Sequence, residues 1–204
     1  MEVYIVLTDT GTYFTKMIKM FTGDQLNHAS ISFSKELDST YSFGRKRPRN
    51  PFIGGFVQEN FNGKLFKHAT CEIYSCSVSE KDYEKMLTFV RKIEAQKEHY
   101  SYNLIGLFGY LLKRRINKKN AFFCSEFVAT TLLNGGIKCN DKPPCFVRPS
   151  DIIANKNMKL IYQGELSEYL LQIGENDDTY NESKGLSKIQ ELISPFLYFR
   201  LLGR

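Results

Sequence analysis

Residues 122–129 have the sequence FFCSEFVA, and the apolar segment that they begin runs up to the glycine pair Gly135-Gly136. Glycine commonly ends a helix, so the pattern predicts a helix over residues 122–133 with Cys124 close to its start. The positive end of the backbone dipole lies at a helix N-terminus and favours the thiolate, the nucleophilic form of cysteine. The stretch therefore marks Cys124 as a candidate nucleophile.

His28 is the second residue with catalytic chemistry. It follows turn residues at 22–24 and stands at the start of a predicted strand. An imidazole next to the Cys124 thiol would take its proton as a base and return it as an acid, and N–H groups at the helix start would hold an oxyanion. A lone cysteine on an apolar helix face is more often a core residue, so the residues alone leave both interpretations open.

Around these two residues the hydrophobic periodicity predicts an α+β chain, in which helices are grouped apart from a small, mostly antiparallel sheet. Cys71 and Cys76 lie on one predicted strand and on opposite faces of it, so at most one is expected in the core. Strands are predicted at residues 3–7, 29–33, 40–43, 54–57, 70–78 and 158–163, helices at 12–21, 80–96, 104–112, 122–133 and 186–202, and a loop at 45–50.

The length and composition of the chain indicate which classes of protein it can belong to. The 204 residues, 42% of them hydrophobic, suffice for a packed core and exclude a disordered chain. We expect one domain over residues 1–174, a flexible acidic linker at 175–185 and a C-terminal amphipathic helix at 186–204, kinked at Pro195. No apolar run is long enough to span a membrane, and residues 1–4 do not begin a secretory signal.

The cysteine count and the net charge indicate which compartment, cofactors and partners to expect. Five cysteines without a framework spacing predict free thiols in the cytoplasm, and neither a metal nor a cofactor is expected. The net charge of +6 permits an anionic partner, such as a lipid head group, although a solvated basic surface explains it equally well. No aromatic residues interleave with the basic clusters, which makes nucleic acid an improbable partner. These clusters contain Arg45, Lys46, Arg47, Arg49, Lys113, Arg114 and Arg115.

Two long segments resemble one known family. Residues 3–44 have a strand, a helix, a glycine turn and then His28 heading a strand, and residues 100–137 lead through an apolar and a basic stretch to Cys124. The segment 148–152 (RPSDI) adds a Pro-Ser-Asp motif. This order, with histidine before cysteine, resembles the circularly permuted papain-like hydrolases of the NlpC-type superfamily, which include the YiiX-like and lecithin:retinol acyltransferase-like proteins. The resemblance covers roughly residues 3–164.

The resemblance implies a papain-like, circularly permuted fold, with Cys124 as nucleophile and His28 as base. The third residue, which orients the imidazole, falls at or near Ser42, where the family pattern would place Glu, His or Asn. A serine hydroxyl accepts a hydrogen bond from an imidazole but stabilises imidazolium less than a carboxylate does. Glu59 could reach in from a neighbouring strand; the alternative for Glu59 is a carboxylate that faces solvent.

The activity implied is thiol hydrolysis or acyl transfer at an amide, through an acyl-cysteine intermediate. Expected substrates are peptides, isopeptides or lipid amides, with no cofactor. Two other classes stay open. One is a degenerate papain-like binding module, for which Ser42 would be the sign of a lost catalytic residue. The other is a peripheral membrane protein held by its basic loops and final helix.

Overall fold

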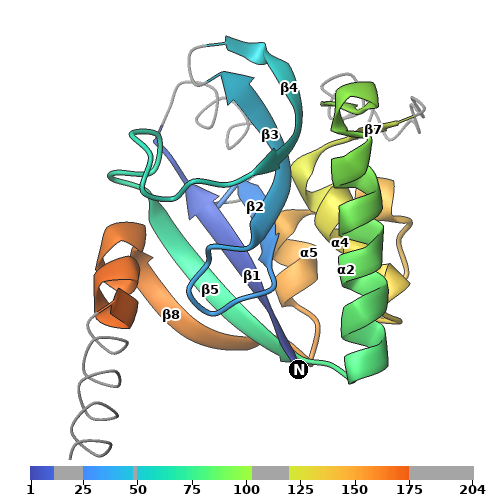
Figure 1. Ribbon diagram of the computed structural model, residues 1–204. Coiled ribbons are helices and arrows are strands. Elements are labelled where there is room, and N and C mark those ends of the chain that lie inside the picture. The colour runs from blue at the N-terminus through green and yellow to red at the C-terminus, as the bar shows by residue number, and fades with distance from the viewer. Residues whose placement is uncertain (12–24, 48–49, 103–119, 175–204) are drawn as a thin grey trace, which may run out of the picture. The chain divides into compact units, whose positions relative to one another are not determined.

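A computed structural model of the chain describes residues 1–11, 25–47, 50–102 and 120–174 (Figure 1). The helices predicted at 12–21, 104–112 and 186–202 and the linker at 175–185 lie outside the described residues. The chain divides into two compact units, residues 1–167 and 168–204. The division thus falls before the predicted boundary at residue 174. Of the second unit the structure describes residues 168–174, which are helical.

The first unit is built on a six-stranded antiparallel sheet, which confirms the α+β class with a mostly antiparallel sheet. Its strand order is β4-β3-β2-β1-β5-β8. A second sheet pairs two short parallel strands, β6 and β7. The strands are β1 (Glu2–Asp9), β2 (His28–Ser32), β3 (Thr40–Arg47), β4 (Asn50–Gln58), β5 (Thr70–Ser77), β6 (Ser101–Tyr102), β7 (Ala121–Phe122) and β8 (Lys159–Glu165).

Strand β1 is buried on both of its faces. Val3 belongs to the main hydrophobic core, and Thr8, on the opposite face, is also fully buried. The same double cover buries Cys76, which pairs with Val3, and Cys71, which pairs with Thr8. Both cysteines are therefore buried, on opposite faces of the sheet, and of the two Cys76 is the one that belongs to the main hydrophobic core, in line with the expectation of at most one.

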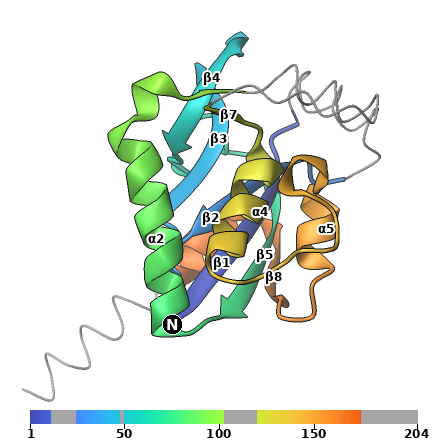
Figure 2. The ribbon, with the colours of Figure 1, turned by 90° about the vertical axis from the view of Figure 1, so that its right-hand side faces the viewer.

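The described part of this unit also contains the helices α2 (Glu80–Ala95), α4 (Cys124–Asn134) and the short α5 (Pro149–Ile153). Ser79 caps α2, since its Oγ accepts a hydrogen bond from the Asp82 N–H at 3.1 Å. Both α2 and α4 lie on the same face of the sheet (Figures 1 and 2). The helix predicted over 122–133 begins at Cys124, because Phe122 belongs to β7. Two single turns of 3-10 helix occupy Lys97–His99 and Pro144–Phe146.

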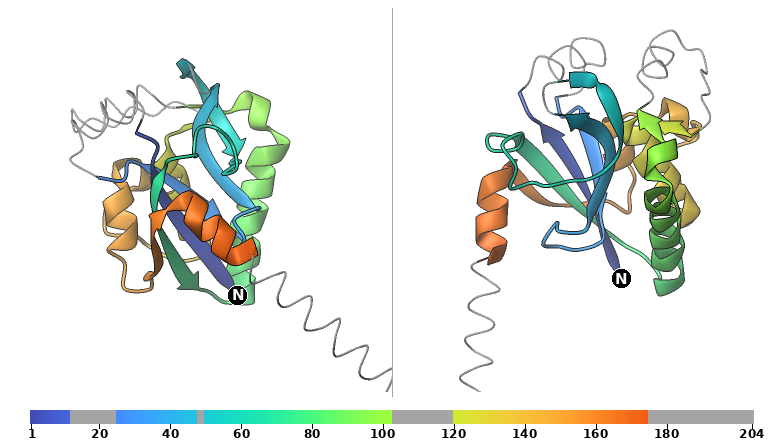
Figure 3. Two further views of the ribbon diagram at one scale, coloured as in Figure 1. Left: turned by 90° about the vertical axis from the view of Figure 1, so that its left-hand side faces the viewer. Right: turned by 45° about the horizontal axis from the view of Figure 1, so that its top comes forward.

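The prediction of a loop at residues 45–50 is wrong at residues 45–47 and 50, while residues 48–49 lie outside the described residues. Strand β3 continues to Arg47, and β4 begins at Asn50, with Arg45 paired to Gly54 and Arg47 to Asn50. The two strands run side by side along a curved path (Figure 3). Cross-strand pairing here outweighs the local composition, since β-structure depends more on context than on the preferences of single residues.

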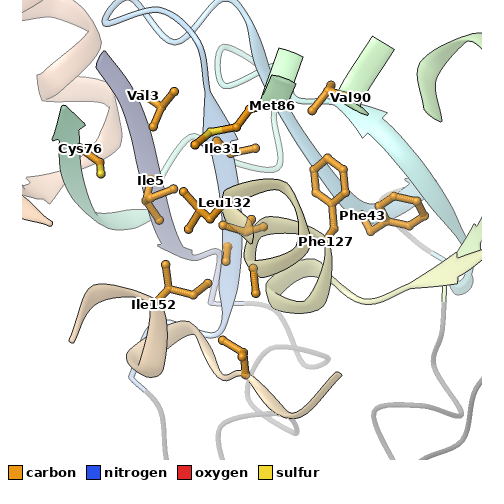
Figure 4. Packing of buried hydrophobic residues seen from close by; sticks show 14 of the residues in the cluster. Val3, Ile5, Ile31, Phe43, Cys76, Met86, Val90, Phe127, Leu132 and Ile152 are labelled. Carbon is orange, nitrogen blue, oxygen red and sulfur yellow. The ribbon is translucent and has the colours of Figure 1, made fainter. Parts of the chain in front are cut away.

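Phe127 of α4 is the centre of the aromatic core that holds this helix on the sheet. It is fully buried, and its ring lies 5.2 Å from that of Phe43 and 5.8 Å from that of Phe56, measured between centroids (Figure 4). Further rings around it belong to Phe89 and Phe122.

Replacing Phe127 with alanine is expected to lower the free energy of unfolding by ~3–5 kcal/mol, because a buried aromatic side chain would leave a cavity. The measurement is urea unfolding followed by circular dichroism. Leu133→Ala is the control on the same helix, since Leu133 is 43% exposed; it should cost about 0.5 kcal/mol. Equal losses in the two variants would contradict this account of the core.

Candidate active site

The structure brings His28, Glu59 and Cys124 together. His28 is the first residue of β2, Cys124 is the first residue of α4, and Glu59 directly follows β4. The His28 Nε2 atom lies 2.8 Å from Glu59 Oε1. The imidazole also interacts with the Cys124 thiol, whose sulfur lies 3.9 Å from the carbonyl oxygen of the neighbouring Asn27 and donates to it. Because Nε2 is held by Glu59, Nδ1 is the nitrogen left for the sulfur. The imidazole thus bridges a carboxylate and a thiol.

The start of α4 is fixed by contacts on both sides of Cys124. The Glu126 carboxylate accepts a hydrogen bond from the Phe123 N–H at 3.4 Å, which closes the first helical turn. The Ser125 hydroxyl donates to the Val147 carbonyl at 2.7 Å. The preceding Phe122 packs on the aromatic core from β7. The nucleophile candidate therefore stands at a rigid junction between a strand and a helix.

The sheet opens where the thiol and the imidazole meet. Strands β2 and β3 pair only through Ile31–Tyr41 and Ser32–Thr40, and α4 contacts both strands. Beside the opening, Gly44 has no side chain: a Cβ at this position would stand 3.4 Å from His28 Cε1. This distance is an ordinary van der Waals contact, so Gly44 lies directly against the imidazole.

Glu59 occupies the position from which an imidazole is oriented. Its side chain is 9% exposed, and its N–H donates to the Thr40 carbonyl at 2.9 Å, which continues the ladder between β3 and β4. The alternative of a carboxylate facing solvent is therefore wrong. Ser42, which we expected to contact the imidazole itself, instead donates its hydroxyl to Glu59 Oε1 at 2.5 Å. Alternation puts Val57 and Glu59 on one face of the sheet, and because Val57 pairs with Ser42 the β3–β4 register brings Ser42 and Glu59 together.

The site favours charged forms on all three residues. Burial raises the pKa of the Cys124 thiol, but hydrogen bonds from His28 and from the N–H groups of Ala29 and Ser125 outweigh it, so the pKa is lowered. Burial lowers the pKa of His28, yet its bonds to Cys124 and Glu59 raise it above the ordinary value. Burial likewise opposes ionisation of Glu59, whose pKa the bonds from His28 and Ser42 bring below its usual range. The arrangement favours thiolate, imidazolium and carboxylate.

Three further thiols behave in the opposite way: those of Cys71 and Cys76, which are buried, and that of Cys139, which is half-buried. Burial raises the pKa of Cys71 to about 12 and that of Cys139 to about 11, and it also raises the pKa of Cys76. Among the residues that the structure describes, no cationic group offsets the burial at these three. Only the thiolate reacts as a nucleophile, so a lowered pKa separates Cys124 from them.

The comparisons with known proteins identify no family for the chain, so its function has to be argued from the geometry of the site. No family model matches the chain, and a search of the curated proteins finds no match. Within the described ranges, no helix has the length and apolar character needed to cross a membrane. Among these same residues, no group of three or more His, Cys, Asp or Glu side chains is placed to hold a metal ion.

The basic residues predicted to meet an anionic partner are described only in part. Lys46, on β3, is exposed, and its Nζ lies 3.9 Å from a carboxylate oxygen of Glu98. Arg45 and Arg47 are also on β3. The remaining members of the clusters, Arg49, Lys113, Arg114 and Arg115, lie outside the described residues, so an anionic partner stays a prediction.

Proposed function

We propose that the chain is a cysteine hydrolase or acyltransferase that cleaves an amide through an acyl-Cys124 intermediate. The observation that carries the proposal is the half-buried imidazole of His28, which lies against the Glu59 carboxylate and interacts with the Cys124 thiol. We also propose a circularly permuted papain-like fold. An antiparallel sheet packed against the cysteine helix, with the histidine strand earlier in the chain, supports it.

The reaction follows from the charges at the site. The Cys124 thiolate attacks the amide carbonyl carbon, a C–S bond forms, and the carbonyl electrons move to oxygen. N–H groups at the start of α4 stabilise the oxyanion. When the intermediate collapses, the C–N bond breaks and His28 gives its proton to the departing amine. Water or a second nucleophile, deprotonated by His28, then attacks the thioester and releases the Cys124 thiol.

Glu59 keeps its charge throughout this cycle. Its contact with Nε2 orients the ring and stabilises the imidazolium, while the proton moves at Nδ1. This contact also bears on the alternative of a degenerate binding module. That alternative rested on the serine at position 42, whereas a carboxylate contacts the imidazole from position 59. The same charges support acyl transfer and hydrolysis alike. The amide of a peptide or of a lipid would fit as the substrate.

Selective alkylation of Cys124 tests the proposal. With limiting iodoacetamide near pH 6, Cys124 of the folded chain should react at least ~100-fold faster than Cys71, Cys76 or Cys139, because it alone among these four has a lowered pKa. Mass mapping of the peptides measures each rate. Cys139→Ser is the matched control and should leave the Cys124 rate unchanged. Equal labelling of the four thiols would overturn the proposal.

An activated ester then tests acyl transfer to the sulfur. Mixed with p-nitrophenyl acetate, the chain should release about one nitrophenolate per molecule in a burst and gain one acetyl group, located at Cys124 by peptide mapping. Cys124→Ser should lose the burst. A chain that alkylates selectively at Cys124 but shows no burst would favour the binding module.

The peripheral-membrane alternative needs a separate measurement, because its final helix lies outside the described residues. Flotation with vesicles that contain anionic lipid, at low salt, should carry the full chain but not a chain shortened at residue 184 if this alternative holds. Failure of both chains to float would remove it.

A further inference from the structure

We propose that Ser42 and Ser30 are positioning residues that fix the Glu59 carboxylate against His28 and retain it as the anion. The proposal rests on the function proposed above and adds a layer of hydroxyl groups behind the residues that meet the substrate. Ser42 stands on β3 and Ser30 on β2, the two strands that diverge beside the imidazole.

Ser42 provides the direct contact. It is fully buried, and its Oγ donates to Glu59 Oε1, the same oxygen that lies 2.8 Å from His28 Nε2. A hydroxyl donates a stronger hydrogen bond to a charged carboxylate than to a neutral acid. The Ser42 bond thus favours the carboxylate over the acid.

Ser30 is the second hydroxyl on this side, on the neighbouring strand. It is fully buried, and its Oγ has no hydrogen-bond partner within the described part of the chain. Alternation along β2 points Ser30 away from its neighbours Ala29 and Ile31, which belong to the main core. The hydroxyl therefore faces the Glu59 side of the sheet.

Two hydroxyls are needed because the carboxylate has little contact with water. A side chain that is 9% exposed receives little solvation, and burial by itself favours the neutral acid. The titratable groups at this point come from two elements: His28 of β2 touches Glu59, and Cys124 of α4 touches His28. A protonated Glu59 would no longer stabilise the imidazolium, and the thiolate would then lose its counter-charge.

The experiment measures the rate of Cys124 alkylation by iodoacetamide from about pH 4 to pH 8. Removing a donor that favours the anion raises the pKa of Glu59, so the imidazolium–thiolate pair is lost at a higher pH. The acid limb is the fall of the alkylation rate towards low pH, and its midpoint is the pH at which the rate is halved. For Ser42→Ala this midpoint should rise by about one pH unit, so that alkylation below the midpoint is roughly 10-fold slower. Ser30→Ala should shift the midpoint in the same direction by less. Ser42→Thr, which retains a hydroxyl, should restore the limb.

Ser32→Ala is the matched control. Ser32 lies on β2 with the same alternation as Ser30 and is as deeply buried, but its hydroxyl donates to the Ser34 carbonyl instead of the active site. Its acid limb should match that of the unmodified chain. Thermal unfolding of each variant establishes that it is folded at the temperature of the assay. Should Ser42→Ala fail to fold, the shift of Ser30→Ala relative to Ser32→Ala decides the question.

The outcomes separate this inference from the proposed function. Loss of Cys124 selectivity in the unmodified chain overturns the function. Selective labelling with the same acid limb in the Ser42, Ser30 and Ser32 variants overturns the role of the hydroxyls and leaves the function standing. An acid limb that rises in the Ser42 and Ser30 variants, but not in Ser32→Ala, supports both.

Discussion

Replacing His28 with alanine is expected to slow alkylation of Cys124 near pH 6 by at least ~100-fold. The variant loses the cation that opposes the burial of the thiolate, so burial dominates and the thiol pKa rises above its ordinary value. The measurement is the second-order rate constant with iodoacetamide. The same variant should also lose the burst with p-nitrophenyl acetate, because a positioned acid–base group contributes ~10²–10⁴ in rate.

The chain contains two further histidines that serve as controls. His68 and His99 are both exposed, and neither contacts the site. His68→Ala and His99→Ala should each retain the Cys124 rate within about twofold. A His28→Ala chain that is folded and alkylates at the unmodified rate would show that the helix start alone activates the thiol.

Replacing Glu59 with glutamine is expected to reduce the Cys124 alkylation rate near pH 6 by ~10–100-fold. An amide contacts the ring without opposing its charge, so the pKa of His28 should fall. The sign follows from the raised pKa: imidazolium that persists to high pH beside the carboxylate gives up its proton at a lower pH beside the amide. A nuclear magnetic resonance titration of the His28 ring should show this fall directly.

Glu72→Gln is the matched control for that experiment. Glu72 lies on β5, where its Oε2 accepts a hydrogen bond from the Tyr74 hydroxyl at 2.8 Å and its Oε1 one from Gln163 at 3.1 Å. The change removes a hydrogen-bonded strand carboxylate without touching the imidazole, so the His28 titration should stay as it was. An unaltered His28 pKa in Glu59→Gln would show that the carboxylate does not support the imidazolium.

Several helices and strands could be predicted from the sequence, because the signals that mark them lie within short segments of the chain. The apolar run of β1, the Ser79 cap of α2 and the glycine pair after α4 are properties of short segments. The start of α4 was misplaced by two residues, since Phe122 pairs with the non-adjacent β6 and no local signal marks such a pair. Tertiary pairing likewise makes Arg45 and Arg47 strand residues although their composition is typical of a loop.

The third residue of the site shows a different limit. Both Ser42 and Glu59 were candidates for the residue that orients the imidazole. Which of them contacts the ring, and which lies behind it, is set by the register of β3 and β4 and by the hydrogen bond from the Glu59 N–H to the Thr40 carbonyl. These are contacts between distant parts of the chain. A single sequence contains the residues of such a network without the register that connects them.

The three contributing segments lie far apart along the chain: 31 positions separate His28 from Glu59, and the sulfur of Cys124 contacts a carbonyl 97 positions earlier. Residue 28 leaves the ribosome long before residue 124, and neither has its partner until β2, β4 and α4 have all docked. A chain that has not reached this structure therefore carries a thiol of ordinary pKa at this position. Under the proposed function, rapid alkylation of this sulfur at acid pH would report that the native structure has formed.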